Sequence, residues 1–163
     1  QCNTRGPAAI LGLMDRKPTI EDAIILAAAA HRGQVDKAGE PYILHPLRVM
    51  LQLEDEAGRI TAALHDVLED TATTADNLQG WGYDEEVIEA LEALTKREGE
   101  SYADFIERLA PNPLARRVKL ADLADNMNVR RLRVVGDADR NRLARYQAAR
   151  QRLQAGTEAP STP

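Results

Sequence analysis

The chain has 163 residues, 44% hydrophobic and 29% charged, which is typical of a globular domain and not of a disordered segment. Its net charge of −5 is unevenly spread, with 10 Lys or Arg against 21 Asp or Glu in residues 1–114 and 11 against 4 in residues 115–152. This balance argues against an extended DNA or RNA interface, and no long apolar window predicts a membrane span. The N-terminal residues do not resemble a secretory signal, and a single cysteine, Cys2, favours a cytoplasmic protein over a disulfide scaffold or a cysteine-based zinc site.

Helix-forming residues dominate the composition. The chain has 26 Ala and 19 Leu against 16 Val and Ile, and no stretch alternates apolar with polar residues. The sequence therefore predicts one all-α domain at residues 18–154. A poorly specified segment at 1–17 and a disordered tail at 155–163 are expected on either side of it.

Capping residues, prolines and glycines mark the ends of the predicted helices. Thr19 with Asp22 forms a partial capping box, and His45 is expected to be the N-cap before Pro46 in a first turn. A Thr-rich link and a turn around Trp81 are expected after the third helix. The predicted helices run from about 19 to 31–33, 46 to 56–58, 59 to 70, 84 to 97, 101 to the prolines at 111 and 113, 114 to 135, and 139 to 154.

The segment from Ala62 to Thr71 carries a cluster of ligand-type side chains. On one continuous helix, at about 100° per residue, His65, Asp66, Glu69 and Asp70 fall within an arc of about 140°. The solvated face of an amphipathic helix has a similar pattern, but so much clustered negative charge favours a compensating cation. Imidazole combined with carboxylate suits Mn²⁺, Fe²⁺ or Zn²⁺.

Further ligands would have to come from other parts of the chain. Asp122 lies in the middle of a predicted helix on an apolar stripe, where a carboxylate needs a cation or hydrogen-bond donors. A salt bridge with Lys119 or Arg116 explains that position as well as a metal does. His45 is either a metal ligand whose backbone is held rigid by the following proline or a helix N-cap. His31, at a predicted helix C-terminus, is better explained by the helix dipole.

Several motifs occur in order over residues 19–135. They are Ala30-His-Arg-Gly-Gln34, Gly39-Glu-Pro-Tyr-Ile-Leu-His-Pro46, His65-Asp-Val-Leu-Glu-Asp-Thr71, Leu94-Thr-Lys96 and Lys119-Leu-Ala-Asp122. This set resembles the HD phosphohydrolase superfamily and, within it, the hydrolase domain of RelA/SpoT-type alarmone enzymes and the small stand-alone alarmone hydrolases. The resemblance implies an all-helical HD-domain bundle that hydrolyses guanosine 3′,5′-bis(diphosphate) at its 3′ end. The synthetase domain of the family has no counterpart in these 163 residues.

The resemblance also implies roles for individual residues. Glu69 and Asp70 match the family's acidic pair, which is essential for hydrolysis. By their chemistry, Glu69 would orient or deprotonate the attacking water, with Asp70 assisting. Asn126 matches a nucleotide-contacting position, and Tyr42 is expected near the sugar or base. One Mn²⁺ is expected, held by His45, His65, Asp66 and Asp122. Candidate cations for the phosphates are Lys37, Arg32, Arg116, Arg117 and Lys119.

The chain differs from the family in two motifs that are associated with nucleotide binding. Asp36-Lys-Ala-Gly39 stands where the family commonly has Arg-Lys-Ser-Gly, so Asp36 reverses a charge and Ala38 lacks a hydroxyl. After Asp122, Leu123-Ala-Asp-Asn-Met127 replaces Arg-Leu-His-Asn-Met. The alternatives are therefore an HD-family phosphohydrolase of another nucleotide, or a catalytically silent alarmone-binding module. The expected partner is a nucleotide, and the sequence does not indicate an oligomeric state.

Overall fold

The computed structural model describes residues 16–128 and 136–155. Regular structure in these ranges is helical, and residues Val35 and Pro41 form an isolated β-bridge in the loop before the second helix. The helices are α2 (Ile20–Ala30), α3 (Leu44–Met50), α4 (Glu56–Leu64), α5 (Val67–Asp70), α6 (Ala75–Gly80), α7 (Glu85–Leu94), α8 (Tyr102–Leu109), α9 (Pro113–Asn126) and α10 (Asp137–Ala155). The predicted all-α fold is confirmed. None of the described helices combines the length and the apolar character needed to cross a membrane.

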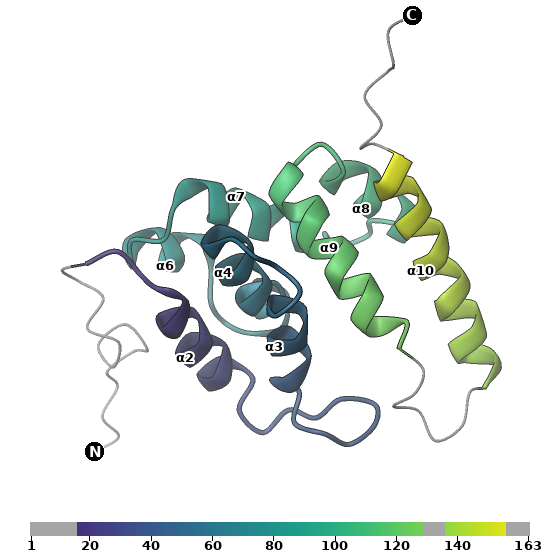
Figure 1. Cartoon of the computed structure of the whole chain (residues 1–163), viewed down its shortest axis with the longest axis horizontal. Coiled ribbons are helices and arrows are strands. Elements are labelled where there is room, and N and C mark those ends of the chain that lie inside the picture. Colours follow the sequence, from purple (N-terminus) through teal and green to yellow (C-terminus); the bar gives the residue numbers. More distant parts are fainter. Residues whose placement is uncertain (1–15, 129–135, 156–163) are drawn as a thin grey trace, which may run out of the picture.

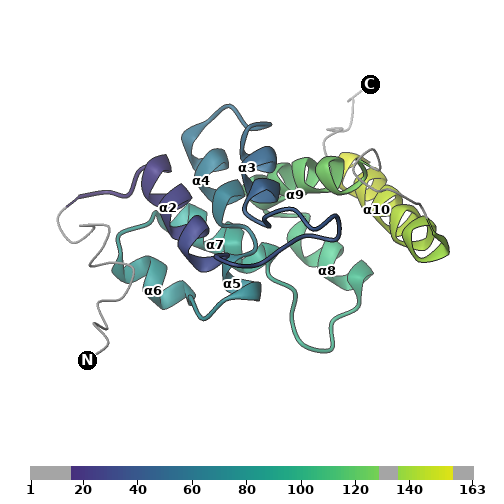
Figure 2. The same cartoon turned by 90° about the horizontal axis from the view of Figure 1, so that it is seen from below.

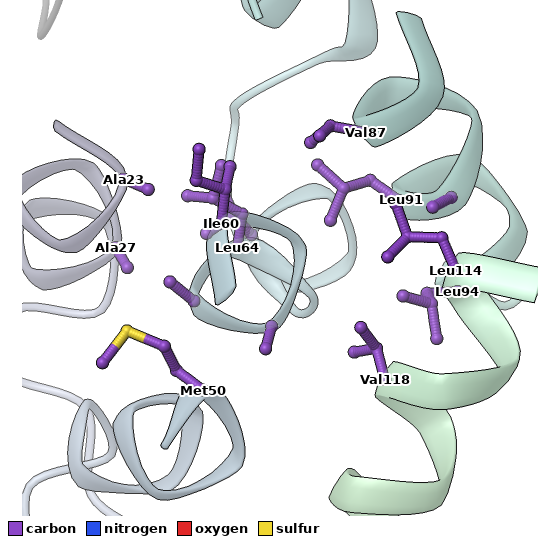
Figure 3. Packing of buried hydrophobic residues seen from close by; sticks show 14 of the residues in the cluster. Ala23, Ala27, Met50, Ile60, Leu64, Val87, Leu91, Leu94, Leu114 and Val118 are labelled. Carbon is purple, nitrogen blue, oxygen red and sulfur yellow. The ribbon is translucent and has the colours of Figure 1, made fainter. Parts of the chain in front are cut away.

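Helix α4 lies at the centre of the larger hydrophobic cluster and contacts α2, α3, α7 and α9 (Figure 1). Leu64 and Leu91 are fully buried there, and burial of such a side chain contributes about 1.5–3 kcal/mol. Figure 3 shows side chains from all five helices meeting around α4. The labelled members are Ala23, Ala27, Met50, Ile60, Leu64, Val87, Leu91, Leu94, Leu114 and Val118.

A second, separate hydrophobic cluster joins α8, α9 and α10. Its buried members are Phe105, Ile106, Leu109, Ala110, Leu123, Ala149 and Leu153. Figures 1 and 2 both show α10 beside α9, on the side away from α2. Helix α9 therefore packs into both clusters, with Val118 in the first and Leu123 in the second.

Three predicted helix starts are confirmed by their caps. The Thr19 backbone N–H donates to Asp22 Oδ2 at 2.8 Å before α2. Asp84 is the N-cap of α7. Ser101 Oγ accepts from the Asp104 N–H at 3.1 Å before α8. Each of these carboxylates lies at a helix N-terminus, where the dipole favours negative charge.

The continuous helix predicted over residues 59–70 is wrong. Helix α4 ends at Leu64 and α5 begins at Val67, so His65 and Asp66 lie at a break between them. Neighbouring side chains diverge by about 100° on a regular helix, whereas His65 Nε2 lies only 3.0 Å from Asp66 Oδ2. His65 and Asp66 thus enter the same cluster from the junction between α4 and α5.

Other predicted boundaries are also corrected. The second helix ends at Met50 instead of 56–58, because Asp55 starts α4 by accepting the Gly58 N–H at 2.8 Å. His45 lies inside the first turn of α3, whose N-cap is Ile43.

The link predicted after residue 70 contains α6. Thr74 and Asn77 form a reciprocal capping box at its start. Helix α9 ends at Asn126, short of the predicted 135, and residues 129–135 lie outside the described ranges. So do residues 1–15 and 156–163, which hold nearly all of the predicted N-terminal segment and tail.

Candidate metal centre and active site

Four predicted ligands, from three places in the chain, converge on one point. His45 Nε2 lies 3.1 Å from Asp122 Oδ1 and 3.8 Å from Asp66 Oδ2. His65 Nε2 lies 3.0 Å from the same Asp66 oxygen and 3.7 Å from Asp122 Oδ1. Ligand atoms of His45, His65 and Asp122 lie within 4.8 Å of one another, and all three residues are buried. Helices α3 and α9 and the α4–α5 break therefore bring together two imidazoles and two carboxylates.

The outer nitrogen of each imidazole is held by the protein. His65 Nδ1 lies 2.8 Å from the Ala62 carbonyl oxygen, and His45 Nδ1 lies 2.7 Å from Asp125 Oδ2. A carbonyl or carboxylate oxygen only accepts, so each Nδ1 carries the proton. Nε2 of each ring is then left with its lone pair facing the cluster when the imidazole is neutral, as metal coordination requires.

An orphaned polar atom marks where a cation fits. His65 Nε2 is fully buried and makes no hydrogen bond. A buried polar atom without a partner is costly, and this one lies beside two carboxylate oxygens. A divalent ion bound by His45, His65, Asp66 and Asp122 would satisfy this nitrogen and offset the carboxylate charge. The donor set is therefore the type that Mn²⁺, Fe²⁺ or Zn²⁺ accepts.

The protonation equilibria also indicate that the cluster needs positive charge. Burial alone would lower the pKa of His65 and of His45, but the carboxylates around them outweigh it and raise both pKa values. Burial would raise the pKa of Asp122, but Lys119 and the imidazoles outweigh it and hold that pKa well below its usual range. Protons on the histidines supply the charge when no metal does, so metal binding should release protons.

Three neutral or positive groups fix the two carboxylates. Lys119 Nζ lies 2.8 Å from Asp122 Oδ2, and Asn126 Nδ2 donates to Asp122 Oδ1 at 2.5 Å. The Tyr42 hydroxyl donates to Asp66 Oδ2 at 2.5 Å. Lys119 thus occupies one oxygen of Asp122 and leaves the other facing the imidazoles. Of the two alternatives for Asp122, the salt bridge with Lys119 is present, and it coexists with the histidine cluster.

The cluster opens into a cavity of about 390 Å³. Its wall includes the predicted substrate residues Lys37, Tyr42 and Asn126, together with Asp36 and Ala38. Cationic side chains around the cavity are suited to phosphate groups. They are Lys37, Lys96, Lys119 and Arg142.

The two members of the predicted acidic pair differ in position. Glu69 lines the cavity, and its Oε2 accepts the Lys96 backbone N–H at 3.1 Å. Asp70 is exposed and does not line the cavity. Partial burial raises the pKa of Asp70, and the negative charges of Asp66 and Glu69 add to that shift. Glu69 is thus the carboxylate placed to act on a ligand in the cavity.

Some predicted binding residues lie elsewhere. Arg32, Arg116 and Arg117 do not line the cavity, and Arg117 pairs with Asp55 at 2.6 Å. The cavity therefore gives no support to their predicted role in binding phosphate. His31 is buried outside the cluster, with Nδ1 2.8 Å from Gln34 Oε1 and its ring against Tyr42.

Sequence reasoning missed four residues. Arg142 of α10 and Lys96 line the cavity, although only Lys96 stood in a quoted motif. Asp125 binds both His45 and Arg48, across 80 and 77 residues of sequence. The replacement of a family histidine by Asp125 was the only signal for that pair.

Comparison with known proteins agrees with this geometry, although no family model matches the chain. The guanosine-3′,5′-bis(diphosphate) 3′-pyrophosphohydrolase of Aquifex aeolicus is 36% identical over 138 residues, which are 77% of this chain and 19% of that protein. The GTP pyrophosphokinase of Myxococcus xanthus is 34% identical over 127 residues, which are 66% of this chain and 16% of that protein. The chain is a homologue of the SpoT-type alarmone enzymes. It spans about a fifth of the length of these curated relatives.

The fold of this SpoT-type homologue matches a solved structure over nearly its whole length. A metazoan ortholog of SpoT superposes with a TM-score of 0.70 at 23% identity, covering 88% of this chain and 90% of that one. The expected HD-type helical fold of the SpoT-type homologue is thereby supported.

Proposed function

We propose that the protein is a Mn²⁺-dependent pyrophosphohydrolase of guanosine 3′,5′-bis(diphosphate) (ppGpp) and its pentaphosphate pppGpp. The products would be GDP or GTP and pyrophosphate. The observation that carries the proposal is the buried, unpartnered Nε2 of His65 beside Asp66 and Asp122, in a cavity whose lining includes Lys37, Lys96, Lys119 and Arg142. His45, His65, Asp66 and Asp122 would hold one metal ion per chain.

The curated relatives alone do not decide between hydrolysis and synthesis. Their names include both a pyrophosphohydrolase and a pyrophosphokinase, and this chain spans only 19% and 16% of them. The metazoan SpoT ortholog, of which the chain covers 90%, is described as hydrolysing ppGpp. Hydrolysis is thus the activity described for a relative of nearly the same length as this chain.

The residues of the cavity can perform a hydrolytic displacement. A bound divalent ion would lower the pKa of a water and neutralise phosphate charge. Glu69, held by the Lys96 amide, would take the proton of the attacking water. The water oxygen bonds to the phosphorus on the 3′ oxygen, the phosphorus–O3′ bond breaks, and pyrophosphate leaves while O3′ gains a proton. Lys37, Lys96 and Arg142 would bind the phosphates, and Tyr42 and Asn126 would contact the nucleotide.

A second candidate is hydrolysis of another phosphorylated nucleotide. It is favoured by Asp36, a carboxylate on the cavity wall where the family commonly has an arginine. Asp36 Oδ1 accepts the backbone N–H groups of Ala38 and Glu40 at 2.8 and 3.0 Å, so this residue shapes the loop that carries Lys37. A nucleotide panel separates the two candidates, since preferred turnover of a nucleotide without a 3′-diphosphate would favour the second.

The test is pyrophosphate release from ppGpp by metal-stripped protein, with and without added Mn²⁺. Release that depends on Mn²⁺ would support the reaction and the metal together. His65→Ala or Asp66→Ala should abolish metal binding and release together, because each removes a ligand. Arg117→Gln, on α9 but outside the cavity, is the matched control and should behave as wild type. Bound Mn²⁺ without release would direct the search to other nucleotides, and absence of both would contradict the proposed centre.

The compartment and a silent binding role are also open to test. The single cysteine is consistent with the reducing cytoplasm, where we expect the protein to act. If the chain were only an alarmone-binding module, a variant unable to hydrolyse, such as Glu69→Gln, would retain the full biological effect.

A further inference from the structure

Asp125 forms an unusual connection behind the metal centre. Its Oδ2 accepts the Nδ1–H of His45 at 2.7 Å, on the opposite side of the ring from the nitrogen that faces the cluster. Asp125 is buried, with 6% of its surface exposed, so this hydrogen bond lies in a medium of low dielectric. A carboxylate in this position can control both the tautomer and the orientation of His45.

Arg48, in the last turn of α3, binds the other side of Asp125. Its Nε donates to Asp125 Oδ1 at 2.7 Å, and its Nη2 donates to Oδ2 at 3.1 Å. The fork therefore engages both oxygens of Asp125 and turns them away from the cluster. Asp125 consequently faces the ring of His45 and not the metal position, although it lies only three residues from Asp122.

We infer that Asp125 is a positioning residue for the metal ligand His45, and that its hydrogen bond to Nδ1, not its ion pair with Arg48, carries that role. The inference rests on the proposed metal centre and adds to it a residue that the family pattern does not predict, since Asp125 stands where a histidine is common. Asp125 keeps the proton on Nδ1 and aims the Nε2 lone pair at the cation. It also makes the imidazole a stronger donor than one bound to a neutral acceptor.

The decisive measurement is the affinity of purified protein for Mn²⁺ alone, by competition with a fluorescent chelator. Asp125→Asn keeps the shape of the side chain but removes its charge, and it should weaken Mn²⁺ binding by about ten- to hundred-fold. Arg48→Met removes the contact between α3 and α9 that Arg48 makes, yet leaves the His45–Asp125 hydrogen bond. It should bind Mn²⁺ within about threefold of wild type.

The pair of variants distinguishes positioning from simple helix bridging. If Asp125 only connected α3 to α9, Arg48→Met and Asp125→Asn would lower the affinity for Mn²⁺ equally, and that result would overturn the inference. Equal affinity of Asp125→Asn and wild type would overturn it too. If the wild type bound no Mn²⁺, the proposed centre itself would fail, which is a separate outcome.

A second measurement needs no variant and so does not depend on folding of Asp125→Asn. In wild-type protein loaded with diamagnetic Zn²⁺, long-range ¹H–¹⁵N NMR should show His45 protonated at Nδ1 and metallated at Nε2. Metal on Nδ1, or an Nδ1 without a proton, would contradict the assignment.

Discussion

Replacement of Lys119 by methionine tests the charge balance of the cluster. The Lys119 ammonium lies 2.8 Å from Asp122 Oδ2, and its side chain is only 14% exposed. Methionine is one atom shorter than lysine and leaves Asp122 without its strongest donor. Asp122 keeps Asn126 and the two imidazoles, so the loss should be that of one buried hydrogen bond to a charged group, about 2–3 kcal/mol.

Metal-free Lys119→Met should therefore unfold at a lower denaturant concentration. At about 2–4 °C per kcal/mol for a chain of this size, its Tm should fall by roughly 5–10 °C. Mn²⁺ should bind the variant more tightly, by at least about tenfold or 1.4 kcal/mol, because no ammonium competes for Asp122. Added Mn²⁺ should then close part of the stability gap.

The assay is urea unfolding of wild type and variant, each with and without Mn²⁺, with Arg117→Gln as the control. Arg117 lies two residues before Lys119 and forms an exposed pair with Asp55, so its loss should cost less than about 1 kcal/mol. Equal stability of metal-free wild type and Lys119→Met would refute the reasoning, as would weaker Mn²⁺ binding by the variant.

Two other variants test the acidic residues. Glu69→Gln should bind Mn²⁺ as wild type does but lower kcat about 10²–10⁴-fold, since it removes only the proton acceptor, and metal loss equal to that of His65→Ala would contradict this role. Asp22 is the pH probe: its hydrogen bonds with Arg16 outweigh its burial and lower its pKa to about 2. The stabilisation by ionised Asp22 is present above the unfolded pKa near 3.8 and is lost as the pH falls through 2. The free energy of unfolding of wild type should therefore exceed that of Asp22→Asn by about 1–2 kcal/mol at pH 7, and the two should be equal near pH 1. That magnitude is reduced because Arg16 is half-exposed, and a gap that persists at pH 1 would exclude the ion pair as its source.

The sequence allowed prediction of what depends on local chemistry. Thr19 and Ser101 lie before helices because their side chains or their neighbours satisfy free backbone N–H groups, and this signal needs no tertiary contact; Asp84 is an N-cap without such a side-chain hydrogen bond. The four metal-ligand candidates could be named because the motifs kept their spacing. Their convergence within a few ångströms is a property of the fold, which spacing alone does not provide.

The features that the sequence did not predict have different causes. The break at His65 and Asp66 has no proline or glycine to indicate it, so the local sequence does not predict it. The His45–Asp125–Arg48 connection joins residues nearly 80 positions apart, so no window along the chain contains it. Helix α6 was missed because its capping box lies in a run of threonines that also suits a loop.

The two separate hydrophobic clusters support different parts of the cavity wall. The four candidate metal ligands come from α3, the α4–α5 break and α9, which pack into the larger hydrophobic cluster. Another part of the cavity wall comes from α8 and α10, which pack into the smaller hydrophobic cluster. Tyr102, Arg142 and Tyr146 on that wall share no buried core with His45 or His65. Substitutions of Tyr102, Arg142 or Tyr146 that leave Leu123 of α9 in place can therefore alter which ligand the cavity admits while the metal ligands keep their support, so that ligand range can evolve independently of the proposed hydrolytic chemistry.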